Sequence, residues 1–201
     1  MTLELTSPAF THEGAIPALY TCDGEDCSPA PALYTCDRED RSPGLRWSGM
    51  PAGTKSLVLI MAETDAPNAA PPRTVWVHWI VYDLPPHATH LSEAVKSQGL
   101  PAGTHEGLND WKHARYDGPC SAVDRRRYVF ELYALGIVLP DLNRPNNSEL
   151  QRAMHGHILE QAALAGHYQR RTAEVLEFTH GLDRHPSSDE ENEYGIPAEN
   201  L

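Results

Sequence analysis

Two polar side chains, Asp65 and His78, lie beside or within strongly apolar segments and are the first candidates for chemistry. A carboxylate and an imidazole can act as an acid–base pair, or they can bind a charged ligand. An imidazole buried among aromatic residues must be hydrogen-bonded or line a cavity, because leaving it unpaired costs about 1–3 kcal/mol. A core histidine held by a backbone carbonyl and an aspartate in a turn are the simpler interpretations, and these two residues alone do not decide between them.

The segments around these two residues are predicted to be β-strands. Residues 55–62 (KSLVLIMA) and 75–83 (VWVHWIVYD) are apolar without alternation, which is typical of strands buried on both faces. A third run, residues 128–136, has the same aromatic and β-branched character. The two-residue period of a strand would place four side chains of the second run on one face: Trp76, His78, Ile80 and Tyr82.

Loops and one helix complete this picture. Clusters of proline and glycine between the apolar runs are typical of turns. Near the end of the chain the apolar spacing changes to that of an amphipathic helix, predicted over about residues 148–165. Ser148 and Gln151 would form its capping box, and Gly166 would end it. Strands followed by one late helix indicate a mainly β fold with a C-terminal amphipathic helix.

The charge of the chain is negative and unevenly distributed. The formal net charge is −12, and residues 172–201 contribute −7 of it, with eight acidic residues against Arg184. We predict a single domain of residues 1–171, followed by a disordered acidic tail of residues 172–201. The acidic balance argues against nucleic-acid binding, which needs clustered Lys and Arg. No apolar run approaches eighteen residues and the start lacks the order of a signal peptide, so we expect a cytoplasmic protein without a membrane span.

The cysteines do not suggest a metal site. Cys22, Cys27, Cys36 and Cys120 are separated by four, eight and 83 residues, without the close pairs typical of zinc ligands. The standard nucleotide-binding and hydrolase motifs do not occur either, so we expect no metal and no cofactor. Reduced thiols are the default in the cytoplasm. The alternative is a bond between Cys120 and one cysteine of the YTCD segment, which occurs twice.

Five segments in order resemble those of one protein family. They are SPGLRWSGMPAGTKSLVLIMAETDAP, WVHWIVYDLP, LPAGTHEGLNDW, YDGPC with RRYVFELYAL, and AMHGHILEQAALAGHYQR. Together they are similar to the phosphatidylethanolamine-binding protein family, in particular its bacterial branch, the Raf kinase inhibitor-like proteins. The resemblance runs from about Phe10 to Arg170.

The resemblance implies an antiparallel β-sandwich with a C-terminal helix and a small pocket that binds phosphate or a phosphoethanolamine head group. It also implies a binding and regulatory protein rather than an enzyme. Arg126 stands where the family has a second pocket histidine, and a guanidinium is a natural bidentate partner of phosphate. The family's other pocket residues fall on Asp65, Pro67, His78, Pro119 and Tyr128.

Two other functions remain open. Some family members inhibit kinases or proteases through their loops, which would make the pocket incidental, and a docking surface leaves no sequence motif. The resemblance also leaves a homodimer open. An acid–base hydrolase that uses Asp65 and His78 would need a nucleophile with its own activating base, and the sequence shows none.

One fourteen-residue stretch occurs twice in tandem. Residues 17–29 and 31–43 are identical at eleven of thirteen positions. A solenoid needs at least three repeats, so we interpret the second copy as a local insertion within one domain. The family pattern contains one copy, and Gly24 of the first copy suits a turn with positive φ better than Arg38 of the second. We therefore predict that residues 20–24 take the family's position and that most of residues 30–43 form an exposed excursion.

Overall fold

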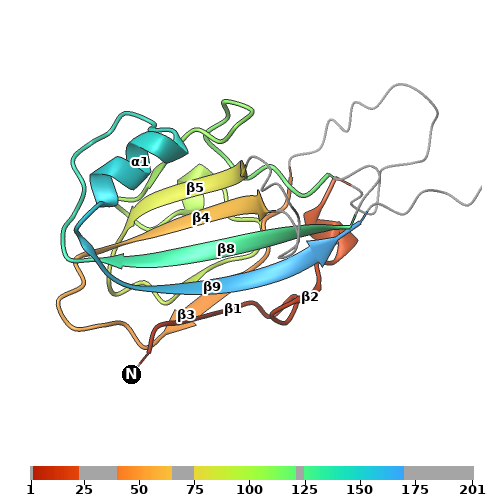
Figure 1. The fold of residues 1–201 in the computed structure, drawn as a ribbon, viewed down its shortest axis with the longest axis horizontal. Helices are drawn as coiled ribbons and strands as arrows, with labels where there is room; N and C mark the ends of the chain where they lie inside the picture. The colour runs from red at the N-terminus through yellow and green to blue at the C-terminus, as the bar shows by residue number, and fades with distance from the viewer. Residues whose placement is uncertain (1, 23–39, 65–74, 121–124, 170–201) are drawn as a thin grey trace, which may run out of the picture.

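Two β-sheets and one helix make up the fold in the computed structural model, which describes residues 2–22, 40–64, 75–120 and 125–169. The larger sheet has six strands in the order β2-β9-β8-β4-β5-β7, and the smaller has three in the order β1-β3-β6. Figure 1 shows β5, β4, β8 and β9 side by side as the long strands. The bounds of the larger sheet's strands are Gly14–Ala15 (β2), Ile158–Tyr168 (β9), Arg126–Leu135 (β8), Ser56–Thr64 (β4), Trp76–Leu84 (β5) and His105–Glu106 (β7).

The three strands predicted from apolar runs are confirmed as the centre of this sheet. One face of β4, β5 and β8 packs against the smaller sheet, formed by β1 (Glu4–Thr6), β3 (Leu45–Ser48) and β6 (His90–Leu91), in a core cluster that includes Leu59, Trp79 and Phe130. The other face packs against Leu150 and Met154 of helix α1 (Asn147–Met154). Burial on both faces explains why these strands lack polar alternation. The long strands pair antiparallel, and the mainly β, sandwich-like prediction is correct.

The length predicted for the helix is wrong. Helix α1 ends at Met154, and residues 158–168 form β9, which pairs along its length with β8. The capping box consists of Asn146 and Glu149 rather than Ser148 and Gln151. Gly156, at φ +79°, allows the chain to turn out of the helix into the strand. The alanine-rich sequence of β9 favours a helix, but pairing with β8 and packing on the core override that propensity.

Gly166 lies within β9 and does not end a helix. A β-carbon at this position would lie 2.6 Å from Cγ1 of Ile16 and 2.9 Å from a ring carbon of Phe10. The glycine therefore permits close packing of the N-terminal segment against β9. Beside it, β2 runs parallel to β9, and Gly14 pairs with Gly166.

The duplicated stretch contributes to the fold from both copies. Tyr20 and Thr21 of the first copy are buried, as expected for the family's position. In the second copy, Ser42 is only 1% exposed and its carbonyl accepts a hydrogen bond from the Ala94 backbone N–H at 2.9 Å. The expected exposed excursion is therefore wrong for Ser42 and for Pro43, which is also buried. Ser42 and Pro43 must come from the second copy because its last residues lead directly into β3.

Several predictions on chain organisation fall on residues outside the described ranges. These are the remaining part of the duplicated stretch, residues 23–39, and the acidic tail, residues 172–201. Among the residues that the structure describes, no helix has both the length and the apolar character needed to cross a membrane.

Candidate functional site

The pairing of β5 with β4 is irregular at His78. Its neighbours Val77 and Trp79 pair with the consecutive β4 residues Ala62 and Met61, so His78 is the extra residue of a β-bulge. The predicted face of Trp76, His78, Ile80 and Tyr82 is therefore wrong, because Val77 joins Ile80 and Tyr82 in the cluster under α1. A bulge re-aims the side chain at its position, and bulges are frequent near functional sites.

The two ring nitrogens of His78 have different surroundings. Nδ1 lies 2.8 Å from the backbone carbonyl of Asp117. Because a carbonyl only accepts hydrogen bonds, Nδ1 carries a proton. Nε2 has no hydrogen-bond partner among the described residues, although the residue is only 1% exposed. A buried ring nitrogen that makes no hydrogen bond is costly.

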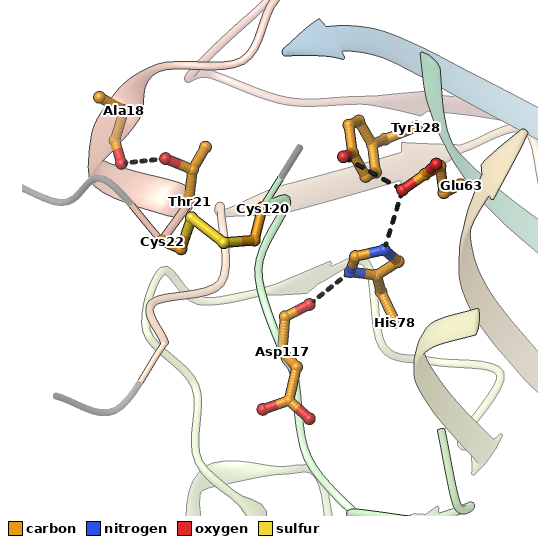
Figure 2. The surroundings of a disulfide bond; sticks show 8 residues. All are labelled: Ala18, Thr21, Cys22, Glu63, His78, Asp117, Cys120 and Tyr128. Carbon is orange, nitrogen blue, oxygen red and sulfur yellow. Dashed lines mark hydrogen bonds and ion pairs between the residues drawn. A yellow bond between two sulfur atoms is a disulfide. The ribbon is translucent and has the colours of Figure 1, made fainter. Parts of the chain in front are cut away.

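Glu63, near the end of β4, faces this ring nitrogen. Its Oε2 lies 3.9 Å from Nε2 of His78, which is within ion-pair range but beyond hydrogen-bond distance. The Tyr128 hydroxyl donates to Oε2 at 3.3 Å, and Arg126 Nη1 lies 3.3 Å from Oε1. Figure 2 shows the glutamate between His78 and Tyr128. Register explains the arrangement, since Glu63 pairs with Tyr128 across β4 and β8.

The electrostatics of this group fix its protonation states. The neighbouring His78, assisted by the charge of Arg126 and the hydroxyl of Tyr128, lowers the pKa of Glu63 despite its partial burial. Burial, together with the negative charge of Glu63, raises the pKa of Tyr128 well above its usual value. At neutral pH the site therefore presents a carboxylate and a protonated phenol that can donate.

Aromatic rings enclose the imidazole. The Trp111 ring lies edge-on to His78 with centroids 4.9 Å apart, and Tyr128 does the same at 5.2 Å. Trp76 packs edge-on against Trp111 at 5.3 Å. Trp76 and Trp111 are 40% and 41% exposed, so the two indoles connect the buried imidazole to the molecular surface.

The loop that carries Asp117 is held by its own hydrogen-bond network. The Asp117 carboxylate accepts from Asn109 Nδ2 at 2.6 Å and from Arg115 Nε at 3.0 Å, and it lies 2.8 Å from His113 Nδ1. Burial raises the pKa of Asp117, but these hydrogen bonds and the Arg115 charge outweigh it, so the pKa lies below its usual value. Asn109 Nδ2 also donates to the His78 carbonyl at 3.2 Å. The network fixes the Asp117 carbonyl that holds Nδ1 of His78.

The structure brings three of the predicted site residues together: His78, Arg126 and Tyr128 surround Glu63. Pro119 lies in the loop that carries Asp117, and its carbonyl accepts from the Cys22 backbone N–H at 3.0 Å. The predicted Asp65 and Pro67 lie outside the described residues. The ligand-binding role assigned to all of these positions stays a prediction.

Sequence reasoning missed Glu63 as a site residue. The available signal was its place at the end of a buried strand, but only the pairing of β4 with β8 brings it to Tyr128. No group of three or more His, Cys, Asp or Glu side chains that could hold a metal ion occurs within the described part of the chain.

The expected reduced thiols are also wrong for two cysteines. Cys22 and Cys120 form a disulfide, which joins the first YTCD copy to the loop of Pro119. The sequence offered this bond as the alternative. Its formation depends on contacts between segments 98 residues apart, which spacing alone does not reveal. A cytoplasmic location remains a prediction.

Comparisons with known proteins indicate the family of the chain. A family model described as "Phosphatidylethanolamine-binding protein" matches residues 6–169. A UPF0098 protein of Methanothermobacter thermautotrophicus is 39% identical over 169 residues, covering 84% of this chain and 99% of that protein. A UPF0098 protein of Chlamydia pneumoniae is 34% identical over 168 residues, again covering 84% and 99%.

Two solved structures share the fold. A phosphatidylethanolamine-binding protein homologue from Chlamydia trachomatis, CT736, has a TM-score of 0.69 and 35% identity, and the match covers 85% of this chain and 99% of that one. YbcL of E. coli, described as a new member of the mammalian PEBP family, has a TM-score of 0.68 at 23% identity and covers 85% and 100%. The family match and the relatives show that this chain belongs to the phosphatidylethanolamine-binding protein family.

Proposed function

We propose that this protein binds a small phosphate-bearing ligand, inorganic phosphate or a phosphoethanolamine head group, and acts as a regulatory binding protein. The observation that carries the proposal is Nε2 of buried His78, which makes no hydrogen bond and lies beside the charges of Glu63 and Arg126. Membership of the family supports the same class of ligand.

The charges favour a zwitterion over a bare anion. Because Nδ1 is committed to the Asp117 carbonyl, Nε2 donates to a phosphate oxygen only when the imidazole takes up a second proton. Arg126 supplies a second cation for the phosphate. Glu63 would repel a bare phosphate but would attract an ammonium group. A phosphoethanolamine head group carries a phosphate for His78 and Arg126 and an ammonium group for Glu63.

We propose binding without turnover. Hydrolysis of an ester through a covalent intermediate would need a nucleophilic side chain activated by His78. Among the described residues, no serine, threonine or cysteine side chain is hydrogen-bonded to this ring, and Cys22 and Cys120 are joined to each other. Inhibition of a kinase or protease through the loops, and a homodimer, stay predictions.

The test is an NMR titration that follows the His78 ring nitrogens while phosphoethanolamine, phosphate or ethanolamine is added. We expect saturable shifts at Nε2, tighter binding of phosphoethanolamine than of either part, and binding weakened about 5- to 30-fold in His78→Ala, as for loss of one charged hydrogen bond. His87→Ala, an exposed histidine in the turn after β5, is the control. Equal affinities in wild type and His78→Ala would refute the proposal.

A further inference from the structure

The loop that orients His78 is fastened to the start of the domain by a disulfide. Cys120 ends the described part of this loop, and its bond to Cys22 joins it to the segment after the short 3-10 helix η1 (Ala18–Tyr20). Figure 2 shows the bond on the same side of His78 as the Asp117 carbonyl, with Glu63 and Tyr128 beside the other ring nitrogen. Two hydrogen bonds accompany the disulfide, from Cys22 N–H to the Pro119 carbonyl at 3.0 Å and from the Tyr116 hydroxyl to the Tyr20 carbonyl at 2.8 Å.

The same loop is hydrogen-bonded to both the backbone and the ring of His78. The backbone carbonyl of Asp117, three residues before Cys120, accepts a hydrogen bond from Nδ1 of His78 at 2.8 Å. The Asp117 N–H donates to the His78 carbonyl at 3.2 Å. A shift of this loop would remove the acceptor that orients the ring, so that the direction of Nε2 would no longer be fixed. The loop's position therefore determines where Nε2 points.

The loop packs closely against the N-terminal segment. A β-carbon on Gly118 would lie 2.9 Å from the Tyr20 carbonyl oxygen and 3.2 Å from Cα of Thr21. Gly118 also donates its backbone N–H to the Asp40 carboxylate, so the second copy of the duplicated stretch touches the loop as well. With backbones this close, a movement of the Cys22 segment is transmitted directly to the loop.

The disulfide joins two residues that lie at the surface of the molecule. Cys120 is exposed and Cys22 is partly exposed, whereas the Asp117, Gly118 and Pro119 residues between the bond and His78 are buried. A thiolate attacks a disulfide sulfur in line, so exposure of one sulfur is what exchange requires.

We propose that the Cys22–Cys120 disulfide is a redox switch that sets the ligand affinity of the His78 site, an inference that rests on the proposed function. The oxidised bond holds the Asp117 carbonyl on Nδ1 and keeps Nε2 available for the ligand. Reduction by a dithiol proceeds through a mixed disulfide that the second thiol of the reductant resolves. Two electrons and two protons pass to the protein, which gains two thiols, and the reductant becomes a disulfide. The loop then depends on hydrogen bonds alone, and the affinity falls.

The experiment uses the full chain with Cys27→Ser and Cys36→Ser, so that no third cysteine can exchange with the pair. Phosphoethanolamine affinity and the ring nitrogen shifts of His78 are measured in the oxidised protein, after reduction with a dithiol under anaerobic conditions, and with Cys22→Ser and Cys120→Ser added. We expect affinity to fall about fivefold or more on reduction, as for one misdirected hydrogen bond, and the serine variant to match the reduced protein. The ring shifts should move from a single tautomer toward a mixture. Adding the dithiol to the serine variant is the control and should change nothing.

Three outcomes decide between the switch and its alternatives. Equal affinities and equal His78 ring shifts in both redox states would show a purely structural bond and overturn the switch. If reduction unfolds the chain, as judged by its amide spectrum, the bond stabilises the whole domain and the proposal is likewise wrong. If neither state binds phosphoethanolamine, the proposed function fails, while a tautomer change on reduction would still support redox control of His78.

Discussion

Replacement of Glu63 with glutamine should reverse the ligand preference of the site. Glutamine keeps the shape of the side chain, and its carbonyl oxygen can still accept from Arg126, while its amide nitrogen can donate to the oxygen of the Tyr128 hydroxyl. The change therefore removes one negative charge and reverses one hydrogen bond. Phosphoethanolamine should bind more weakly because its ammonium loses a partner. Inorganic phosphate should bind more tightly because a repulsive charge beside Nε2 of His78 is gone.

The structure sets the size of this effect. Two unit charges 4 Å apart interact by about 1 kcal/mol in water and about 4 kcal/mol near a protein surface. The Glu63 side chain is 24% exposed and lies between these limits. We expect about 1–2 kcal/mol for each ligand, which is a factor of about 5–30 in affinity, with opposite signs.

Isothermal titration calorimetry with both ligands at low and moderate salt measures this reversal. Glu131→Gln is the matched control, because Glu131 of β8 also accepts from a tyrosine hydroxyl, that of Tyr133 at 3.0 Å. The control should leave both affinities unchanged. If Glu63→Gln moved both affinities in the same direction, or moved neither, the charge argument would be wrong.

Three further predictions concern the frame around the site. Gly118→Ala should destabilise the fold by about 1–3 kcal/mol in urea unfolding and weaken ligand binding, because its β-carbon would press on the Tyr20 carbonyl; unchanged stability would contradict the close contact. Arg127 and His167 lower the pKa of Glu13 to about 2 from 4.5, so the stability they contribute is complete above pH 4.5 and is lost as the pH falls toward 2. Glu13→Gln should therefore flatten the acid limb of the stability curve, and an unaltered limb would refute the assignment. Deleting residues 25–38 restores one copy of the duplicated stretch while keeping Tyr20–Cys22 and Asp40–Pro43, and it should leave stability equal or higher by about 1 kcal/mol; unfolding at lower urea would show that the intervening residues support the fold.

The strands of the core and the polar residue within them were predictable from sequence. Residues 55–62, 75–83 and 128–136 are apolar because both faces of β4, β5 and β8 are covered, and this condition is visible in a single chain. His78 stands out because a polar ring in such a run needs an explanation. Arg126 and Tyr128 came from the family resemblance rather than from pattern.

What sequence could not supply depends on pairing between distant segments. β9 was mistaken for a helix because its alanines have helical spacing, and only its register with β8 makes it a strand. The bulge that re-aims His78 is a shift in pairing with β4 and has no signature within β5 itself. The same holds for Glu63, which meets Tyr128 across two strands, and for Cys22 and Cys120, which meet across the domain.

The duplicated stretch shows a different limit. Its copies are nearly identical, and the preference for Gly24 over Arg38 in a turn did not reveal that the fold uses residues of both. The buried residues come from both, with Tyr20 and Thr21 at one end and Ser42 and Pro43 at the other. The ends are determined by their attachments, since Cys22 must reach Cys120 and Pro43 must lead into β3.

A crystal structure of the oxidised protein with phosphoethanolamine tests the central claim most directly. We predict a phosphate oxygen within about 3 Å of Nε2 of His78, with the ammonium group against the Glu63 carboxylate and Arg126 on the phosphate. The Nδ1 contact with the Asp117 carbonyl should be unchanged at 2.8 Å. A bound ligand that leaves Nε2 of His78 without a partner and occupies another part of the surface would contradict the account.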